Sequence, residues 1–174
     1  MEKKVKKVRA VVINEKGHIL VMKTNNNIYM LPGGKIDDGE SNEEALKREV
    51  LEEAGISLLE EEIKGPFFQT GYHGISIDKP TKQIIRKYVD TQFYIAHTNL
   101  PIDETKMKMT EREKARGQKP CYMNISILRY QIEQERDNPN NCERKKRYDK
   151  ELLQILDKFR SYQIEKTNQN SLLK

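Results

Sequence analysis

Three glutamates in one short stretch are the residues of this sequence best suited to chemistry. Glu49, Glu52 and Glu53 stand close together, and at about 100° per residue they spread over roughly 100° of one helix face. Carboxylates this close repel one another unless water solvates them or a cation bridges them. Hard divalent ions such as Mg²⁺ take oxygen ligands of this kind and add water and phosphate oxygens. The pattern indicates a metal site, and the open alternative is a solvated acidic helix face, which runs of charge usually mean.

A glycine-rich loop leads into these glutamates. Pro32, Gly33, Gly34 and Gly39 fall within eight positions. Such a composition favours a sharp turn and a backbone that a ligand can approach closely. The sequence therefore predicts that a ligand-binding loop and an acidic helix face meet at one place.

The helix that carries the glutamates has clear start and stop signals. Ser41 and Glu44 have the spacing of a capping box, in which each side chain accepts from the other residue's backbone amide. We expect the helix to cover 42–54 and to end at Gly55 in the left-handed conformation. One apolar stripe should then face the core. It consists of Leu46, Val50 and Ala54.

Loop and helix together match the pattern Gly-x5-Glu-x7-Arg-Glu-U-x-Glu-Glu-x-Gly-U, where U is an apolar residue. The nine fixed positions are Gly34, Glu40, Arg48, Glu49, Val50, Glu52, Glu53, Gly55 and Ile56. This string resembles the signature box of the Nudix hydrolases. The resemblance implies an α/β/α sandwich with a central mixed sheet, and the hydrolysis of nucleoside diphosphates linked to another moiety.

The resemblance also implies a metal site. Nudix enzymes use Mg²⁺ or Mn²⁺, and Glu49, Glu52 and Glu53 are the positions that would hold one or more such ions. The backbone carbonyl of Gly33 or Gly34 is a further candidate ligand. A metal beside the diphosphate would neutralise charge on the leaving group and lower the pKa of a bound water.

Catalytic roles follow from the same match. Glu40 and Arg48 are expected to form an ion pair that fixes the loop against the helix, and Arg48 can also reach Glu52 at i,i+4. Either Glu52 or Glu53 is the candidate that activates water. We expect Glu53 to be exposed, so that Glu53→Gln should leave the fold intact.

The substrate is less well defined by the sequence. Gly33 and Lys35 in the loop and Tyr72 further on are candidate substrate contacts. Tyr72 stands at about the distance where dinucleoside polyphosphate hydrolases carry a tyrosine, and the alternative is a ring that stacks in a turn. Other aromatic side chains are candidates for stacking on a base. They are Tyr29, Phe67, Phe68 and Tyr88.

Composition limits the class of protein and its compartment. The chain has 174 residues, of which 36% are hydrophobic and 34% charged, with a net charge of +5. This suits one domain and an anionic ligand. Cys121 and Cys142 do not make a disulfide framework, and the longest apolar run, 10–13, cannot span a membrane. Without an N-terminal secretion signal, we expect a cytoplasmic protein that does not insert into membranes.

The remaining sequence predicts the elements around this site. Expected strands cover 8–13, 19–23, 28–31, 63–70 and 84–96, and a last strand ends at 122–123. Gly71 to Gly74 should break the fourth strand, and a polar segment follows through Lys82. Expected helices cover 125–136, capped by Asn124, and 148–159. We assign 1–160 to a single domain and 161–174 to a polar, frayed tail.

Two charged regions remain open. The segment 99–119 has no clear period apart from a short helix over 110–116, and long loops are often functional. Its glutamates are candidates for an additional acidic group, with solvent exposure as the alternative. They are Glu104, Glu111 and Glu113. Arg144 to Arg147 could steer a phosphate, with a solvated helix start as the alternative.

Partners are a small-molecule nucleotide and no nucleic acid, because no aromatic residues interleave with the basic residues of the first strand. Those basic residues should form a solvated strand edge. They are Lys3, Lys4, Lys6, Lys7 and Arg9. A non-catalytic nucleotide sensor on the same fold is the alternative to an enzyme, although a sensor has no need for all three glutamates. The oligomeric state stays open, a homodimer included.

Overall fold

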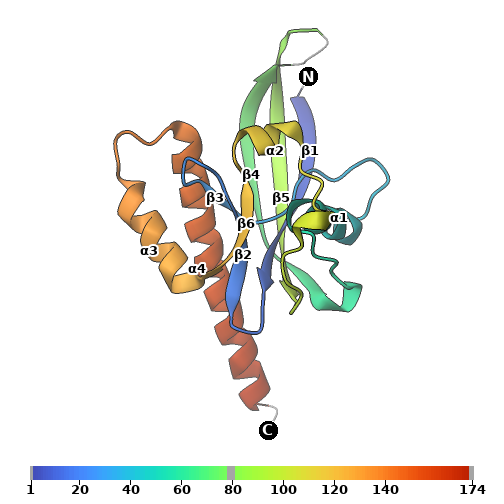
Figure 1. Ribbon diagram of the computed structural model, residues 1–174, viewed down its shortest axis with the longest axis vertical. Helices are drawn as coiled ribbons and strands as arrows, with labels where there is room; N and C mark the ends of the chain where they lie inside the picture. The colour runs from blue at the N-terminus through green and yellow to red at the C-terminus, as the bar shows by residue number, and fades with distance from the viewer. Residues whose placement is uncertain (1, 78–80, 173–174) are drawn as a thin grey trace.

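The fold is built on one mixed sheet. The computed structural model describes residues 2–77 and 81–172 (Figure 1). Their strands follow the order β3-β2-β1-β5-β4, and β6 pairs with β2. Strands β1 and β5 run parallel and the other pairs antiparallel. The strands are β1 Glu2–Ile13, β2 His18–Lys23, β3 Tyr29–Met30, β4 Ile63–Ile77, β5 Ile84–His97 and β6 Lys119–Asn124.

Helices cover both faces of this sheet. The helices are α1 Asn42–Ala54, α2 Glu111–Ala115, α3 Ile125–Arg136 and α4 Glu143–Leu172, with 3₁₀ turns η1 Glu60–Glu62 and η2 Glu104–Lys106. Figure 1 shows α3 and α4 on one side of the sheet and α1 on the other. This arrangement confirms the predicted α/β/α sandwich with a mixed central sheet.

Strand β1 divides the core into two layers. Val8, Ala10 and Val12 pack in the layer of α1, whereas Val11 and Ile13 pack in the layer of α3 and α4. Alternate side chains of a strand point to opposite faces of its sheet, so one strand supplies both layers. Helix α1 and the start of α4 are thereby held on opposite sides of β1.

Helix α1 follows its sequence signals closely. The Ser41 hydroxyl accepts from the Glu44 amide and the Glu44 carboxylate accepts from the Ser41 amide, which confirms the capping box. Gly55 ends the helix at φ 69°. A Cβ there would lie 1.9 Å from the Asp103 carbonyl oxygen, so only glycine fits. The predicted stripe is fully buried. Its members are Leu46, Val50 and Ala54.

Strand β4 does not break at its glycines, so that prediction is wrong. The strand runs through Gly71 and Gly74, and its pairing with β5 continues on both sides of them. The Tyr88 hydroxyl lies 2.0 Å from the point that a Cβ on Gly71 would occupy. Gly71 therefore makes room for a neighbouring ring without ending the strand. The polar segment expected through Lys82 lies in part outside the described residues.

Two elements are longer than the sequence predicted. Strand β1 begins at Glu2 because it pairs with β5 along its whole length. Helix α4 covers Glu143–Leu172, so the frayed tail predicted over 161–174 is helical as far as Leu172. No glycine or proline interrupts this segment, and glutamine, glutamate and lysine favour helices. Positions 173–174 lie outside the described residues, and none of the described helices is long and apolar enough to cross a membrane.

A buried ion pair attaches the start of α4 to the rest of the molecule. Lys145, 4% exposed, contacts Asp149, which is fully buried, at 3.1 Å. The Lys145 ammonium also donates to the Asn27 carbonyl at 3.0 Å and lies 3.1 Å from Glu135. These contacts tie α4 to α3 and to the loop before β3.

We expect Lys145→Met to destabilise the protein by about 3 kcal/mol or more, because Asp149 would stay buried without its counterion. Urea unfolding of the two proteins measures the difference. Lys146→Met is the matched control, since the exposed pair of Lys146 with Glu143 should contribute at most about 0.5 kcal/mol. Equal losses in both variants would contradict a special role for the buried pair.

Candidate active site

A cavity of about 330 Å³ opens where the glycine loop, α1, the segment before β6 and the start of α4 meet. Its lining is rich in both signs of charge. The acidic residues are Asp37, Glu49, Glu52, Glu53 and Glu113. The basic residues are Lys7, Arg9, Lys35, Arg48, Arg116 and Arg144. The other lining residues are Met30, Gly33, Gly34, Thr110, Gln118 and Tyr148.

The glycine loop lies against β1 and α1 together. Gly33 has φ 130°, and a Cβ there would lie 2.2 Å from the Val8 carbonyl oxygen. The Gly34 carbonyl accepts from the Val8 amide at 3.0 Å, which leaves its second lone pair for any other partner. The Glu49 carboxylate lies 2.3 Å from where a Cβ on Gly34 would be. Gly33 is therefore required for the loop to lie against β1, and Gly34 lets the Glu49 carboxylate lie directly against the loop backbone.

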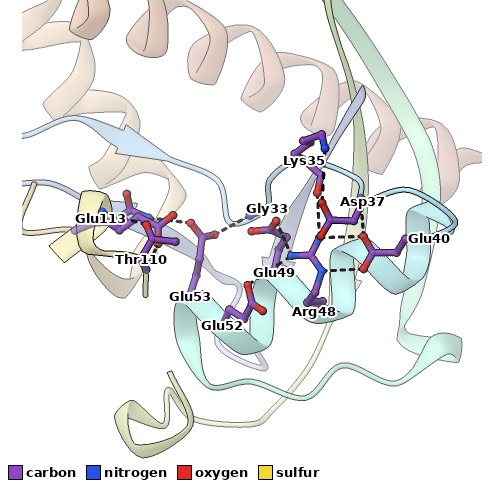
Figure 2. Close-up of polar contacts among 11 residues, drawn as sticks. Gly33, Lys35, Asp37, Glu40, Arg48, Glu49, Glu52, Glu53, Thr110 and Glu113 are labelled. Atoms are coloured by element: carbon purple, nitrogen blue, oxygen red, sulfur yellow. Dashed lines mark hydrogen bonds and ion pairs between the residues drawn. The ribbon is translucent and has the colours of Figure 1, made fainter. Parts of the chain in front are cut away.

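Glu53 is buried, which corrects the expectation of an exposed carboxylate. Its side chain is 6% exposed. One carboxylate oxygen accepts from the Gly33 amide (Figure 2) and the other from the Gln118 side chain, each at 2.8 Å. Burial raises the pKa of Glu53 to about 8, although the Gly33 hydrogen bond opposes the shift. The helical wheel could not reveal this burial, because Gln118 covers Glu53 from a distant part of the chain.

Arg48 lines the same cavity and contacts side chains from both the glycine loop and α1. Its guanidinium makes two parallel contacts with Glu40 at 2.8 and 2.9 Å, which confirms the predicted pair. The same group contacts Glu49 at 2.8 Å and Glu52 at 3.5 Å, and donates to the Lys35 carbonyl at 3.0 Å. Figure 2 shows loop and helix side chains converging on this one guanidinium.

The carboxylates fit a divalent cation by type but not by their present positions. Among the described residues, no group of three or more histidine, cysteine, aspartate or glutamate side chains is arranged to hold a metal ion. Glu49 and Glu52 turn toward Arg48, whereas Glu53 turns toward Gly33. Burial raises the pKa of Glu49 as well as that of Glu53, so an added positive charge would be favourable here. Glu49 and Glu52 each contact Arg48 through one carboxylate oxygen, so holding a common ion would need these side chains to move.

The other candidate residues separate into two groups. Of the three loop glutamates, Glu113 lines the cavity, whereas Glu104 and Glu111 are absent from its lining. Tyr72 is also absent from the lining, and its ring lies 5.0 Å from the Arg147 guanidinium. The structure thus brings the loop glycines and Lys35 to the helix glutamates and leaves Tyr72 outside.

Several lining residues were not predicted as part of the site. The sequence predicts a solvated strand edge for Lys7 and Arg9, and it gives no indication of a role for Gln118 or Tyr148. Arg144 belongs to a basic cluster for which steering a phosphate was one interpretation, and it does line the cavity. Lys7 and Arg9 alternate with Val8, which places both cations on the same face of β1. This alternation could have indicated that the two cations act together at one site.

The fold and the cavity define a class: an α/β/α sandwich in which a glycine turn and an acidic helix meet at a highly charged cavity. The sequence model of the NUDIX domain matches residues 3–117, and the chain belongs to the Nudix family. The matched region includes the glycine loop, all of α1 and Glu113.

Curated relatives match shorter segments. A Haemophilus influenzae (strain ATCC 51907 / DSM 11121 / KW20 / Rd) protein named 8-oxo-dGTP diphosphatase is 39% identical over 90 residues, which are 48% of this chain and 60% of that protein. A Bacillus subtilis (strain 168) protein is 50% identical over 48 residues, covering 27% of this chain and 32% of its own length. The chain thus matches less than two thirds of each relative.

A solved structure supports the fold. The MutT protein from Methanosarcina mazei Go1 aligns with 88% of this chain and 96% of its own length at a TM-score of 0.51 and 18% identity. At this identity the likeness concerns the fold alone.

Proposed function

We propose that this protein is a divalent-metal-dependent pyrophosphohydrolase. Its substrate is a nucleoside di- or triphosphate, or a derivative of a nucleoside diphosphate. The observation that carries the proposal is one cavity lined by Glu49, Glu52 and Glu53 together with basic side chains. The name of the Haemophilus influenzae relative, 8-oxo-dGTP diphosphatase, supports the same reaction class.

The proposed reaction is an attack of water on phosphorus. A new P–O bond forms to the water oxygen, the bridging P–O bond breaks, and the leaving phosphate keeps the electron pair. Glu52 or Glu53 accepts the proton of the water.

The ion proposed for this site would be held by Glu49, Glu52 and Glu53 and by the Gly34 carbonyl. Such an ion, Mg²⁺ or Mn²⁺, supplies charge neutralisation on the phosphates and lowers the pKa of a bound water. The chain's own contribution is positional. Arg48 holds Glu40 on the loop against the helix, while Gly33 and Lys35 face the substrate from the loop.

Release of phosphate or pyrophosphate from a panel of nucleoside di- and triphosphates and nucleoside diphosphate derivatives tests this function. We expect hydrolysis with Mg²⁺ or Mn²⁺ and a loss of at least about 100-fold in EDTA. Chromatography of the products then shows which phosphates leave. Full activity in EDTA would refute the proposed metal dependence. No release from any nucleotide with either metal would refute the proposed hydrolytic activity.

A non-catalytic nucleotide sensor on the same fold is the alternative. A sensor would bind nucleotide and release no phosphate in the same assay. The presence of Glu49, Glu52 and Glu53 together disfavours this alternative, because binding alone does not require all three.

A further inference from the structure

Four cations line the cavity without ion-pair partners among the residues that the structure describes. Lys7 and Arg9 come from β1, Arg116 follows α2, and Arg144 lies in the first turn of α4. We call these four residues the basic wall. Within the described parts of the chain, none of them forms an ion pair with a carboxylate, in contrast to Lys35 and Arg48 in the same cavity.

The contacts that the basic wall does make leave its charge uncompensated. The Arg9 guanidinium donates to the Leu31 carbonyl, and the Arg144 guanidinium lies 5.5 Å from the centre of the Tyr148 ring. A backbone carbonyl and an aromatic ring carry no net charge. The four positive charges therefore face the cavity as a group.

Electrostatics indicates that these cations are close enough to repel one another. Burial lowers the pKa of Lys7, and the neighbouring Arg9 lowers it further. Burial also lowers the pKa of Arg116, with Arg144 as the next cause. Glu151 acts in the opposite direction on Lys7, and Glu113 does so on Arg116. A polyanion in the cavity would relieve this repulsion.

The cavity offers little surface for a nucleobase. Tyr148 is the one aromatic residue in its lining as described. Two guanidinium groups already lie near that ring, Arg144 at 5.5 Å and Arg147 at 5.3 Å from its centre. Met30 supplies the other large apolar side chain. Sites that select a base use aromatic stacking and apolar walls, and this one presents mainly charges.

We propose that the site takes a linear chain of three or more phosphates, whose additional phosphates lie on the basic wall, and that the base contributes little to recognition. The inference rests on the proposed function in one respect: the pyrophosphate to be cleaved faces the glutamates. The basic wall then holds the phosphates that are not cleaved, from the far side of the cavity.

Calorimetric titration with inorganic tripolyphosphate and with pyrophosphate, both in EDTA, tests the basic wall without hydrolysis. We expect the wild type to bind tripolyphosphate at least about tenfold more tightly than pyrophosphate. The double variant Arg116→Gln/Arg144→Gln should lose about 100-fold in affinity for tripolyphosphate and at most about threefold for pyrophosphate. The control Lys150→Gln/Arg160→Gln changes the net charge equally at exposed positions of α4 and should bind like the wild type.

Three results would overturn the proposal that the basic wall binds phosphates. They are equal affinity of the wild type for the two anions, unchanged tripolyphosphate binding by the Arg116/Arg144 variant, and an equal loss in the control. Thermal unfolding of each variant checks the fold, and the wild-type comparison of the two anions decides the question even if a variant fails to fold.

The second arm compares kcat/KM for ATP, GTP, CTP, UTP and 8-oxo-dGTP in the presence of Mg²⁺. Values within about tenfold of one another support recognition through phosphate. A preference of about 100-fold or more for one base would overturn that part of the inference. Tight binding of tripolyphosphate without hydrolysis of any nucleotide would refute the proposed function but would still support phosphate binding by the basic wall.

Discussion

Glu53→Gln is expected to lower kcat by at least about 100-fold without lowering the stability of the protein. The carboxylate lies 6% exposed between the Gly33 amide and the Gln118 side chain. In the variant, the new amide oxygen can accept from Gly33. Its amino group can donate to Gln118 once the Gln118 amide turns over. The hydrogen bonds survive, and only the ability of the carboxyl group to release and take up a proton is lost.

The pH dependence of stability gives this variant a distinct signature. Burial raises the pKa of Glu53 from 4.5 to about 8, so the native state retains a proton that the unfolded state loses. The stability contributed by the neutral form is complete below pH 4.5 and is lost as the pH rises to about 8. Through this one group the wild type should lose up to about 5 kcal/mol over that window. Glu53→Gln should lack that slope.

Urea unfolding in EDTA at both ends of the window, together with kcat in Mg²⁺, measures the two effects. Glu61→Gln is the matched control, because Glu61 is an exposed carboxylate in η1. That variant should keep both the activity and the pH slope of the wild type. Wild-type turnover in Glu53→Gln would exclude Glu53 from the mechanism, and a marked loss of stability at the upper end would contradict the raised pKa.

The half of the site that depends on local rules was predictable from the sequence. A capping box, a left-handed glycine and an apolar stripe fixed the ends of α1 and its buried face. The Glu40–Arg48 pair followed from the match to the Nudix pattern. Each of these features involves residues within a few turns of one another, so the sequence alone carries enough information.

The other half depends on contacts between distant segments. Lys7 and Arg9 become cavity residues because α4 crosses beside β1, and Glu53 becomes buried because Gln118 returns over it. Parallel pairing with β5 extends β1 to Glu2. The basic N-terminal residues of β1 carry no sequence pattern that would predict this pairing. The run of basic residues therefore predicted a solvated strand edge, whereas in the structure Lys7 and Arg9 line the cavity.

Arg48→Ala is expected to damage both stability and activity, because one guanidinium holds two structural elements together. Arg48 contacts Glu40 and the Lys35 carbonyl on the loop, and Glu49 and Glu52 on the helix. The Glu40 and Glu49 side chains are each 15% exposed, so both would lose their counterion in a poorly solvated place. We expect a loss of about 2–4 kcal/mol in urea unfolding. A displaced loop should also lower kcat/KM by about 100-fold.

Two further variants separate charge from geometry at this position. Arg48→Lys keeps the positive charge but cannot make the two parallel contacts with Glu40, so it should recover part of the stability and little of the activity. Arg48→Ala/Glu40→Gln removes the stranded carboxylate and should be more stable than Arg48→Ala alone, with activity still low. If the double variant were instead destabilised by the sum of the losses in Arg48→Ala and in Glu40→Gln, each measured alone, Arg48 and Glu40 would be acting independently. The loop would then owe its position to the backbone hydrogen bonds between Gly34 and Val8 and between Ala10 and Pro32.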